Sequence, residues 1–298
     1  NSMTGNNTSQ GNLRSILFMV VAVGIFSLMD AVMKTLGASY PAMQVAALRG
    51  LAALPLVAGY VLWRGQARTL MRIRWPLHLV RGGMNVAMLW LFNYALQRLP
   101  LTESYTIFFV APLLITILSI VFLGERVSTL QWLAIAVGFA GVLIAMRPEG
   151  NDFFSLGALA VLAAAAMYAL TAILARVVSR TDTSVQVVFW TTVMMSVGAT
   201  TLAAPGWVAI APEHWIWVAA LGLTGFLGGV AITEAFQHGQ ASVVAPFEYT
   251  ALAWGIGLDW LLWQSVPDHY TLLGGAIIIA SGIYLIRQEH GKVVTLPP

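Results

Sequence analysis

The stretch Leu101-Thr-Glu-Ser-Tyr-Thr-Ile-Phe-Phe-Val-Ala-Pro112 begins an apolar run that continues to Leu123, where the chain turns at Gly124-Glu-Arg-Val127. A second apolar run follows this turn and ends at Arg147. Each run is close to the length of about 20 apolar residues that a helix needs to cross a bilayer. The stretch therefore predicts a membrane hairpin, in which two spanning helices are joined by one short charged turn.

The composition of the whole chain fits the same environment. Hydrophobic residues make up 59% of the 298 residues and charged residues only 9%, whereas soluble domains carry about 25% charged residues. The net charge of +3 comes from scattered basic residues, which argues against a nucleic-acid partner. The chain has no cysteine, which excludes disulfides and thiolate metal sites.

Ten apolar segments are long enough to be candidate spans, and the short connections between them leave no room for an inserted soluble domain. The segments are continuously apolar rather than alternating, which argues against a β-barrel. We therefore expect an all-α membrane protein. The predicted spans are residues 13–37, 41–63, 75–97, 100–123, 128–146, 153–178, 183–204, 212–238, 241–263 and 269–287.

Basic residues lie mostly on one side of these predicted spans. The N-terminus, every second loop and the C-terminus hold Arg14, Arg64, Arg68, Arg72, Arg74, Arg126, Arg176, Arg180, Arg287 and Lys292. The opposite loops hold only Arg98 and Arg147. Because cytoplasmic loops carry the excess of Lys and Arg, we expect both termini in the cytoplasm.

A weak internal repeat divides the chain. Gln44-Val45 recurs as Gln186-Val187, and Ala95-Leu-Gln97 recurs as Ala235-Phe-Gln237, each about 140 residues later. We therefore expect two five-helix units, residues 13–147 and 153–287. An odd number of spans makes the second unit enter the membrane from the opposite side, which is the inverted-repeat plan of secondary transporters with a central cavity. A membrane scaffold without transport is the alternative.

Longer motifs carry a family resemblance. The fourth predicted span contains Pro112 and is followed by Leu123-Gly-Glu-Arg126, and the fifth contains Gly138-Phe-Ala-Gly141. The second half contains Ala241-Ser-Val-Val-Ala-Pro-Phe-Glu-Tyr-Thr250 and Gly274-Gly-Ala-Ile-Ile-Ile-Ala-Ser-Gly282. With the repeat, these motifs make the chain resemble the EamA form of the drug/metabolite transporter superfamily, over essentially its whole length. Within that family it is most similar to YddG-type amino-acid exporters.

The resemblance implies a basket of helices around a cavity lined by spans one, three, four, six, eight and nine, and it implies alternating access. The sequence departs from the family at one point, because the Gly-Glu turn after the fourth span is replaced after the ninth by Gln264-Ser265. We therefore interpret Glu125 as a capping residue, or a partner of Arg126, rather than a transport residue.

Polar, aromatic and methionine side chains on the spans that the family assigns to the cavity are candidates for substrate contact. Methionine suits adaptable surfaces because it is flexible and polarisable. Glu248 follows Pro246, which we expect to disturb its helix, and we expect Pro112 to do the same in the fourth span. The candidate cavity residues are Met84, Asn85, Met88, Asn93, Tyr105, Phe109, Met167, Tyr168, Ser242, Phe247 and Glu248. For each residue taken alone, ordinary helix packing is the alternative.

Ionisable residues inside spans are costly and are candidates for coupling or gating. These are Asp30, Lys34 and Glu234. Asp30 and Lys34 lie four residues apart on one helix face and could instead pair with each other. Arg49 and Arg81 also lie within spans. We expect Arg49 to have an orienting role or to form an inter-helix ion pair, with substrate binding as the alternative, and we expect Arg81 to extend to the cytoplasmic interface.

The sequence lacks the phosphate-binding loop, zinc-protease and nucleophile-elbow motifs. We therefore expect a transporter rather than an enzyme, with no cofactor and no ATP hydrolysis in this chain. The expected partners are the lipid bilayer and a small-molecule substrate, and the leading hypothesis is export of amino acids and related metabolites. A larger metabolite or a drug-like cation is the alternative substrate.

Overall fold

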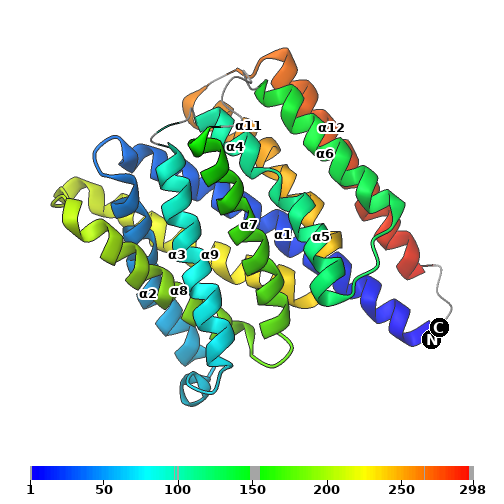
Figure 1. The fold of residues 1–298 in the computed structure, drawn as a ribbon, viewed down its shortest axis with the longest axis horizontal. Helices are drawn as coiled ribbons and strands as arrows, with labels where there is room; N and C mark the ends of the chain where they lie inside the picture. Colours follow the sequence, from blue (N-terminus) through cyan, green and yellow to red (C-terminus); the bar gives the residue numbers. More distant parts are fainter. Residues whose placement is uncertain (1, 97, 99–100, 148–154, 265, 295–298) are drawn as a thin grey trace.

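The computed structural model describes residues 2–96, 98, 101–147, 155–264 and 266–294, and in these residues every regular element is helical (Figure 1). The predicted span ends Gln97, Pro100 and Phe153 lie outside the described residues. An all-α protein, as predicted from the continuous apolar runs, is confirmed for the described part of the chain.

The helices of the first half follow the predicted spans, except that the fourth is broken. They are α1 (Ser2–Gly37), α2 (Ala42–Trp63), α3 (Trp75–Leu96), α4 (Leu101–Phe108), α5 (Ala111–Leu123) and α6 (Thr129–Met146), with a short 3₁₀ turn η1 (Ala67–Thr69) between α2 and α3. A capping box begins α6, because the Ser128 hydroxyl accepts from Gln131 N and the Gln131 side chain accepts from Ser128 N.

The second half has a similar sequence of helices, and here the ninth predicted span is broken. Its elements are α7 (Leu156–Val178), α8 (Ser184–Ala203), η2 (Ala204–Gly206), η3 (Pro212–His214), α9 (Trp215–His238), α10 (Ala241–Val244), η4 (Ala245–Tyr249), α11 (Thr250–Trp263) and α12 (His269–Val294). A second capping box, formed by Thr183 and Gln186, begins α8.

Eight helical segments among the described residues are long and apolar enough to cross a membrane: Gln10–Gly37, Ala42–Trp63, Ser104–Leu123, Thr129–Met146, Leu156–Val178, Ser184–Gly206, Pro212–His238 and His269–Gly291. Many of their large apolar side chains face outward, among them Leu62 and Ile216, which suits contact with lipid tails. The third predicted span, α3, is helical but contains His78, Arg81 and two asparagines, which lower its hydropathy.

Both broken spans are interrupted at a proline, as expected for a residue that lacks an N–H donor and crowds the preceding turn. In the first half, α4 ends at Phe108 and α5 begins at Ala111, directly before Pro112. In the second half, α10 ends at Val244 and Pro246 lies in the 3₁₀ segment η4. The predicted disturbance at these two prolines is confirmed, and it leaves the ninth segment in pieces too short to span alone.

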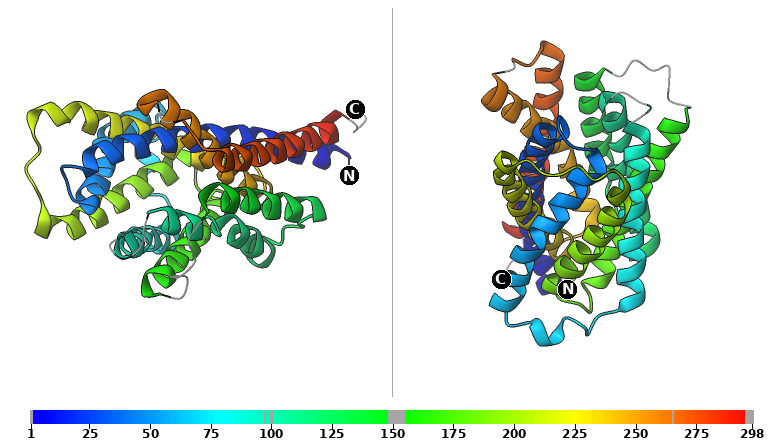
Figure 2. Two further views of the ribbon diagram at one scale, coloured as in Figure 1. Left: turned by 90° about the horizontal axis from the view of Figure 1, so that it is seen from above. Right: turned by 90° about the vertical axis from the view of Figure 1, so that its left-hand side faces the viewer.

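Helices of one half pack mainly against helices of the other (Figures 1 and 2). The principal pairs are α1 with α9, α3 with α7, α2 with α8, and α6 with α12. The last pair lies at one flank of the molecule, where a Cβ at Gly274 would collide with the Gly141 carbonyl, so the two backbones approach closely. The other three pairs, α1 with α9, α3 with α7 and α2 with α8, all contribute residues to the central cavity described below.

The repeated glutamines make matching contacts. Gln44, near the start of α2, donates to the carbonyl of Val208 (2.6 Å) and accepts from its N–H (2.8 Å), which holds the segment that follows α8. Gln186, near the start of α8, donates to the carbonyls of Thr69 (2.7 Å) and Arg72 (3.2 Å), which holds the segment that follows α2. Each glutamine therefore holds the segment that follows the second helix of the other half.

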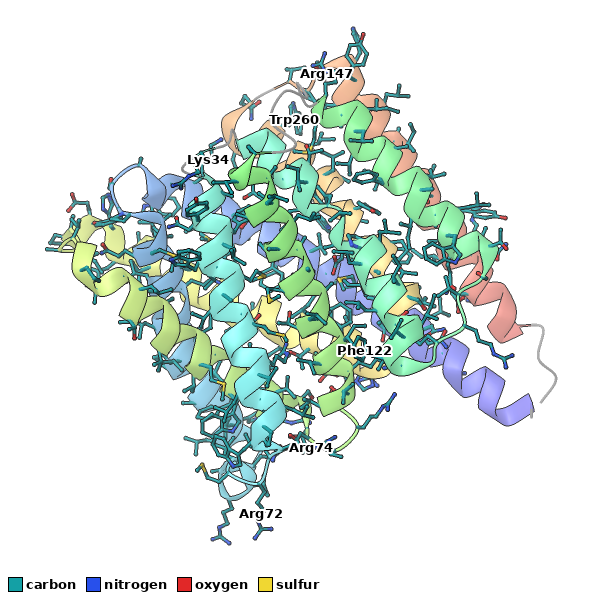
Figure 3. All side chains as sticks on the ribbon, viewed as in Figure 1. Lys34, Arg72, Arg74, Phe122, Arg147 and Trp260 are labelled. Carbon is teal, nitrogen blue, oxygen red and sulfur yellow. The ribbon has the colours of Figure 1, made fainter. Side chains whose placement is uncertain are left out.

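Basic side chains lie at both ends of the molecule. Arg72 and Arg74 lie at one end, and Lys34 and Arg147 lie at the opposite end (Figure 3). The beginning of α1 and the end of α12 lie near each other (Figure 1), and Asn12 donates to Glu289 (3.3 Å) between these helices.

Candidate functional site

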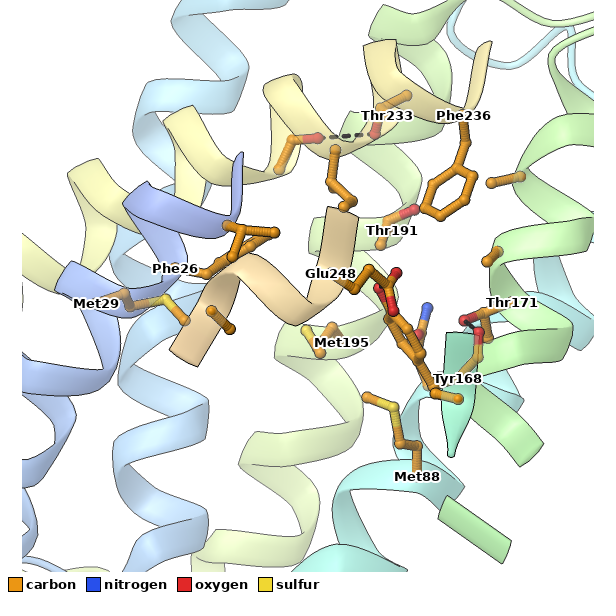
Figure 4. Close-up of a pocket in the computed structure, with 18 of the residues that line it drawn as sticks. Phe26, Met29, Met88, Tyr168, Thr171, Thr191, Met195, Thr233, Phe236 and Glu248 are labelled. Atoms are coloured by element: carbon orange, nitrogen blue, oxygen red, sulfur yellow. Dashed lines mark hydrogen bonds between the residues drawn. The ribbon is translucent and has the colours of Figure 1, made fainter. Parts of the chain in front are cut away.

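A cavity of about 360 Å³ lies between the two halves (Figure 4). Residues of α1 to α5, α7 to α9, η4 and α11 line it, so both broken segments contribute to its wall. Most of the lining is apolar and adaptable, and includes Phe26, Met88, Phe108, Met195 and Phe236. Such a lining, with a few polar groups placed within it, is typical of small-molecule sites.

Four charged side chains line this cavity, and each comes from a different element: Asp30 (α1), Arg49 (α2), Arg81 (α3) and Glu248 (η4). Two are cationic and two are anionic, so the formal charges balance. Ionisable groups at membrane depth are expensive to desolvate unless they pair or face a polar cavity. Their convergence on one cavity is the feature that distinguishes it from an ordinary packing defect.

Arg81 is held in place by two neighbouring helices. Its Nε donates to the carbonyl of Thr171 on α7 (3.2 Å), and its guanidinium also donates to the hydroxyl of Thr191 on α8. Arg81 therefore links α3, α7 and α8 from within the cavity. The prediction that its side chain extends to the cytoplasmic interface is wrong.

Glu248 is also held by a neighbour. The Tyr168 hydroxyl on α7 donates to its carboxylate (2.6 Å), and the two side chains meet at the cavity wall (Figure 4). Only 9% of Glu248 is exposed. The 3₁₀ geometry after Pro246 sets this position, because η4 replaces the regular helix that would otherwise continue α10.

Arg49 and Asp30 have fewer contacts. The Arg49 guanidinium lies 5.5 Å from the centre of the Phe26 ring, a cation–π contact. Asp30 is exposed to the cavity. No ion pair within 4.0 Å joins these two groups within the described residues, although their charges act on each other across the cavity.

Half of the predicted site residues line the cavity. They are Asp30, Asn85, Met88, Tyr105, Phe109, Tyr168 and Glu248. On α3, the lining residues Arg81, Asn85 and Met88 recur at the three- and four-residue spacing of one helix face. Met84 and Asn93 fall outside this face; eight residues turn a helix by about 80° beyond two full turns, which separates Asn93 from Asn85.

The other predicted residues lie elsewhere. Ser242, at the start of α10, is fully buried and donates to Glu125 (2.7 Å), while Phe247 is 1% exposed in the apolar core. Met167 precedes Tyr168 but does not line the cavity. Glu234 lies 2.5 Å from His238 Nε2, one helical turn along α9. Lys34 is exposed near the end of α1.

Several lining residues were missed by the sequence analysis. Thr171, Thr191, Thr192 and Thr233 line the cavity, yet threonine in a membrane helix commonly bonds its own backbone, as Thr233 does to Gly229 (2.8 Å). Arg49 was expected mainly to pair between helices, and substrate binding was only the alternative. Its position in the middle of α2 was the available signal. Among the described residues, no three His, Cys, Asp or Glu side chains gather in a way that could hold a metal ion.

Comparison with known proteins decides the family. The model of the EamA-like transporter family matches residues 13–147 and 155–288, which together cover most of the chain. The chain belongs to the EamA-like transporter family. It is accordingly a multi-pass membrane transporter, and the family resemblance carried by the glycine and proline motifs is confirmed.

Characterised relatives of this EamA-like transporter have different substrates. It is 30% identical over 277 residues to the pseudopaline exporter CntI of Pseudomonas aeruginosa, covering 93% of this chain and 97% of the relative. It is 25% identical to the S-adenosylmethionine uptake transporter of Rickettsia conorii, with 95% and 96% covered. It is 26% identical to the riboflavin transporter of Vibrio cholerae, with 94% and 95% covered.

The fold of this EamA-like transporter is also found in a solved crystal structure of a protein, which superposes with a TM-score of 0.81 at 19% identity and covers 91% of this chain and 96% of the other. At this identity the likeness concerns the fold alone.

Proposed function

We propose that this chain is a secondary transporter that moves a small amphoteric metabolite derived from an amino acid across the bacterial inner membrane by alternating access. The observation that carries the proposal is the central cavity with its two guanidinium groups and two carboxylates. Its volume of about 360 Å³ falls in the range of about 300–1,000 Å³ that is typical of small-molecule sites. Charged groups inside the membrane mark substrate pathways more often than they stabilise a fold.

The architecture that we propose has ten spans in two inverted five-helix repeats, residues 13–147 and 153–287. The helix pairs support it: the first helix of each half packs on the third helix of the other, as α1 on α9 and α7 on α3. The second helices, α2 and α8, pack on each other, as do the fifth helices, α6 and α12. The matching contacts of Gln44 and Gln186 provide further support.

The orientation that we propose places both termini in the cytoplasm. The loop between α2 and α3 carries Arg64, Arg68, Arg72 and Arg74, and it lies at the opposite end from Arg147 (Figure 3). The excess of basic residues at one end supports this placement, because positively charged loops are retained in the cytoplasm.

The substrate class rests on the mixed charge of the cavity. An amphoteric molecule can match both signs, whereas a neutral one would leave two cations and two anions without a partner from the substrate. Amino acids are the smallest members of this class, and export of neutral or aromatic amino acids by a YddG-type transporter is one version of the proposal. A relative named for S-adenosylmethionine, a derivative of methionine, favours larger members of the class. A drug-like cation is a weaker candidate because it would leave the arginines unmatched.

Transport by the purified protein in liposomes tests the proposal. Labelled amino acids, S-adenosylmethionine and riboflavin are supplied in turn, with and without an imposed proton gradient. We expect flux of at least one amphoteric compound above that of empty liposomes. Absence of flux for all of them would overturn the transport proposal, and flux of riboflavin alone would overturn the substrate class.

The same liposomes test proton coupling. Asp30→Asn, Glu234→Gln and Glu248→Gln each remove one acidic group that lies in or near the pathway. If one of these groups carries the proton, its variant loses the pH dependence of flux. An unchanged pH dependence in all three variants would exclude them as the coupling groups.

A further inference from the structure

The four charged groups of the cavity are not equivalent. Arg81 donates to the Thr171 carbonyl and the Thr191 hydroxyl, and Glu248 accepts from Tyr168. These two groups are bound by the protein itself and link neighbouring helices. Arg49 and Asp30, in contrast, make no hydrogen bond and no ion pair within the described part of the chain.

The geometry of Arg49 leaves its donors available. A guanidinium carries five N–H groups in its plane and has a weakly hydrated face. The guanidinium carbon of Arg49 lies over the Phe26 ring, 5.5 Å from the ring centre. The in-plane donors remain without a partner in the described residues, and an unsatisfied guanidinium at membrane depth is costly. A ligand carboxylate is the group that matches these donors, because it can accept two parallel N–H bonds.

Asp30 provides the opposite charge on the neighbouring wall. Its side chain is exposed to the cavity, and both it and Arg49 line the same space. They act on each other electrostatically but lie beyond 4.0 Å. A ligand that carries an ammonium group and a carboxylate on the same carbon atom fits such a separated pair, with the ammonium at Asp30 and the carboxylate at Arg49.

We propose that Arg49 and Asp30 together recognise a free amino-carboxylate group, so that the substrate is a molecule that retains an unmodified α-amino-acid head. The remainder of the substrate lies in the apolar and methionine-rich part of the cavity, where size sets the range of side groups. Arg81 and Glu248 position the helices of the wall. This inference rests on the proposed transport function and narrows its substrate class.

Binding to the wild-type protein tests this assignment without any mutation. L-Methionine, L-phenylalanine and S-adenosylmethionine are compared by calorimetry with their carboxamide or decarboxylated forms and with their N-acetyl forms. We expect loss of either charged group to weaken binding by about 100-fold or more, because a site built to bind a polar group rejects analogues that lack it. Equal binding of a parent compound and its modified forms would overturn the inference, as would binding of none of the parents.

Two variants separate the two charges. Arg49→Gln is expected to abolish the preference for the free carboxylate while the preference for the free amine remains, and Asp30→Asn is expected to do the reverse. Arg72→Gln is the matched control, because Arg72 lies in the exposed loop and its backbone carbonyl, which Gln186 uses, is kept. Unchanged selectivity in both cavity variants would contradict the assignment.

The outcomes distinguish this inference from the proposed function. If amphoteric compounds are transported but their amides and N-acetyl forms bind equally well, the assignment of Arg49 and Asp30 fails and the transport proposal stands. If no amphoteric compound is transported or bound, both fail. If neither variant folds, the ligand series on the wild-type protein still decides the matter.

Discussion

The two halves of the chain are joined differently at the two ends of α6. Glu125, which precedes α6, accepts from the N–H groups of Ala241 (3.0 Å) and Ser242 (3.0 Å) and from the Ser242 hydroxyl (2.7 Å). Arg147, which follows α6, pairs with Asp268 before α12 and lies over the Tyr270 ring (4.5 Å). The two contacts lie at opposite ends of α6.

The contact of Glu125 is buried, whereas the contact of Arg147 with Asp268 is exposed. The Glu125 side chain is 6% exposed, and Arg176 approaches it to 3.8 Å from α7. Arg147 and Asp268 are 53% and 43% exposed. An exposed ion pair contributes about 0–1 kcal/mol, whereas each hydrogen bond to a buried charged group contributes about 1.5–3 kcal/mol.

This difference bears on the alternating access that we propose. A transporter whose halves separate first at one end and then at the other must break the contacts at each end in turn. The Glu125 contact needs more free energy to open than the Arg147 contact, so substrate binding or new contacts must offset a larger cost there. Glu125 is therefore a capping residue, as predicted from its place in a turn, but it caps α10 of the other half and its cationic neighbour is Arg176 rather than Arg126.

The largest effect is expected for Glu125→Ala. The variant leaves the first N–H groups of α10 and the Ser242 hydroxyl without their acceptor, which should lower the stability by about 3 kcal/mol or more. Thermal unfolding in detergent measures this loss. Arg126→Gln is the control, because it removes a neighbouring exposed charge; equal losses in the two variants would contradict the role of Glu125.

The same variant should also change access to the cavity. Because the chain contains no cysteine, Met195→Cys provides a single reporter in the lining. In right-side-out and inside-out vesicles, Glu125→Ala should increase labelling by an impermeant maleimide from the side on which Glu125 lies. Increased labelling from the opposite side, or from neither, would show that this contact does not hold that end closed.

A smaller effect is expected for Arg176→Gln. Arg176 donates to the carbonyls of Phe236 (3.1 Å) and Gln237 (3.0 Å) at the end of α9, and it places a positive charge near Glu125. We expect a loss of about 1–2 kcal/mol in thermal unfolding. In the double variant with Glu125→Ala the two losses should fall short of additive, because neighbouring groups in one network share their energy. Full additivity would indicate two independent contacts.

Ser242→Ala removes one of the three donors to Glu125 and keeps the backbone N–H. The expected loss is about 1 kcal/mol. Since Ser242 was predicted as a cavity residue, the variant also tests that alternative. Flux with altered substrate selectivity and unaltered stability would favour the cavity role over the cap.

The smallest effect is expected at the exposed end. Hydrogen bonds from Thr271 and the nearby positive charge of Arg147 hold the pKa of Asp268 below its ordinary value of 3.8. The stabilisation from this carboxylate is therefore complete above about pH 4 and is lost as the pH falls through the lowered pKa. Asp268→Asn should unfold slightly earlier than wild type at pH 7, and the two should converge at lower pH. Glu213→Gln, an exposed carboxylate on η3, is the control.

Much of the fold could be predicted from local properties of the chain. Length and continuous apolarity predicted the helices, Pro112 and Pro246 predicted the two breaks, and Gln44 and Gln186 indicated the repeat. The third and ninth predicted spans are not among the eight helical segments that are long and apolar enough to cross a membrane. The reason is that α3 carries Arg81 and His78, and that η4 divides the ninth span. Both of these segments contribute residues to the lining of the cavity.

The candidate site was less predictable, because membership in a cavity depends on helix rotation. Asn85 and Met88 lie on the cavity face of α3 and Met84 does not, although all three have suitable chemistry. The same limit applies to Ser242, six residues before Glu248, and to Phe247, directly before it. Ser242 donates to Glu125 and Phe247 lies in the apolar core.

The sequence by itself determined the apolar environment, the apolar segments that form helices and the proline breaks, because each depends on residues close together in the chain. Only the tertiary structure decided which charges meet. Arg81 reaches Thr171 and Thr191, Tyr168 reaches Glu248, and Arg49 and Asp30 face the cavity without such partners among the described residues. These relations depend on the rotation and separation of helices from both halves, and a pattern of apolar residues is too uniform in a membrane protein to specify either one.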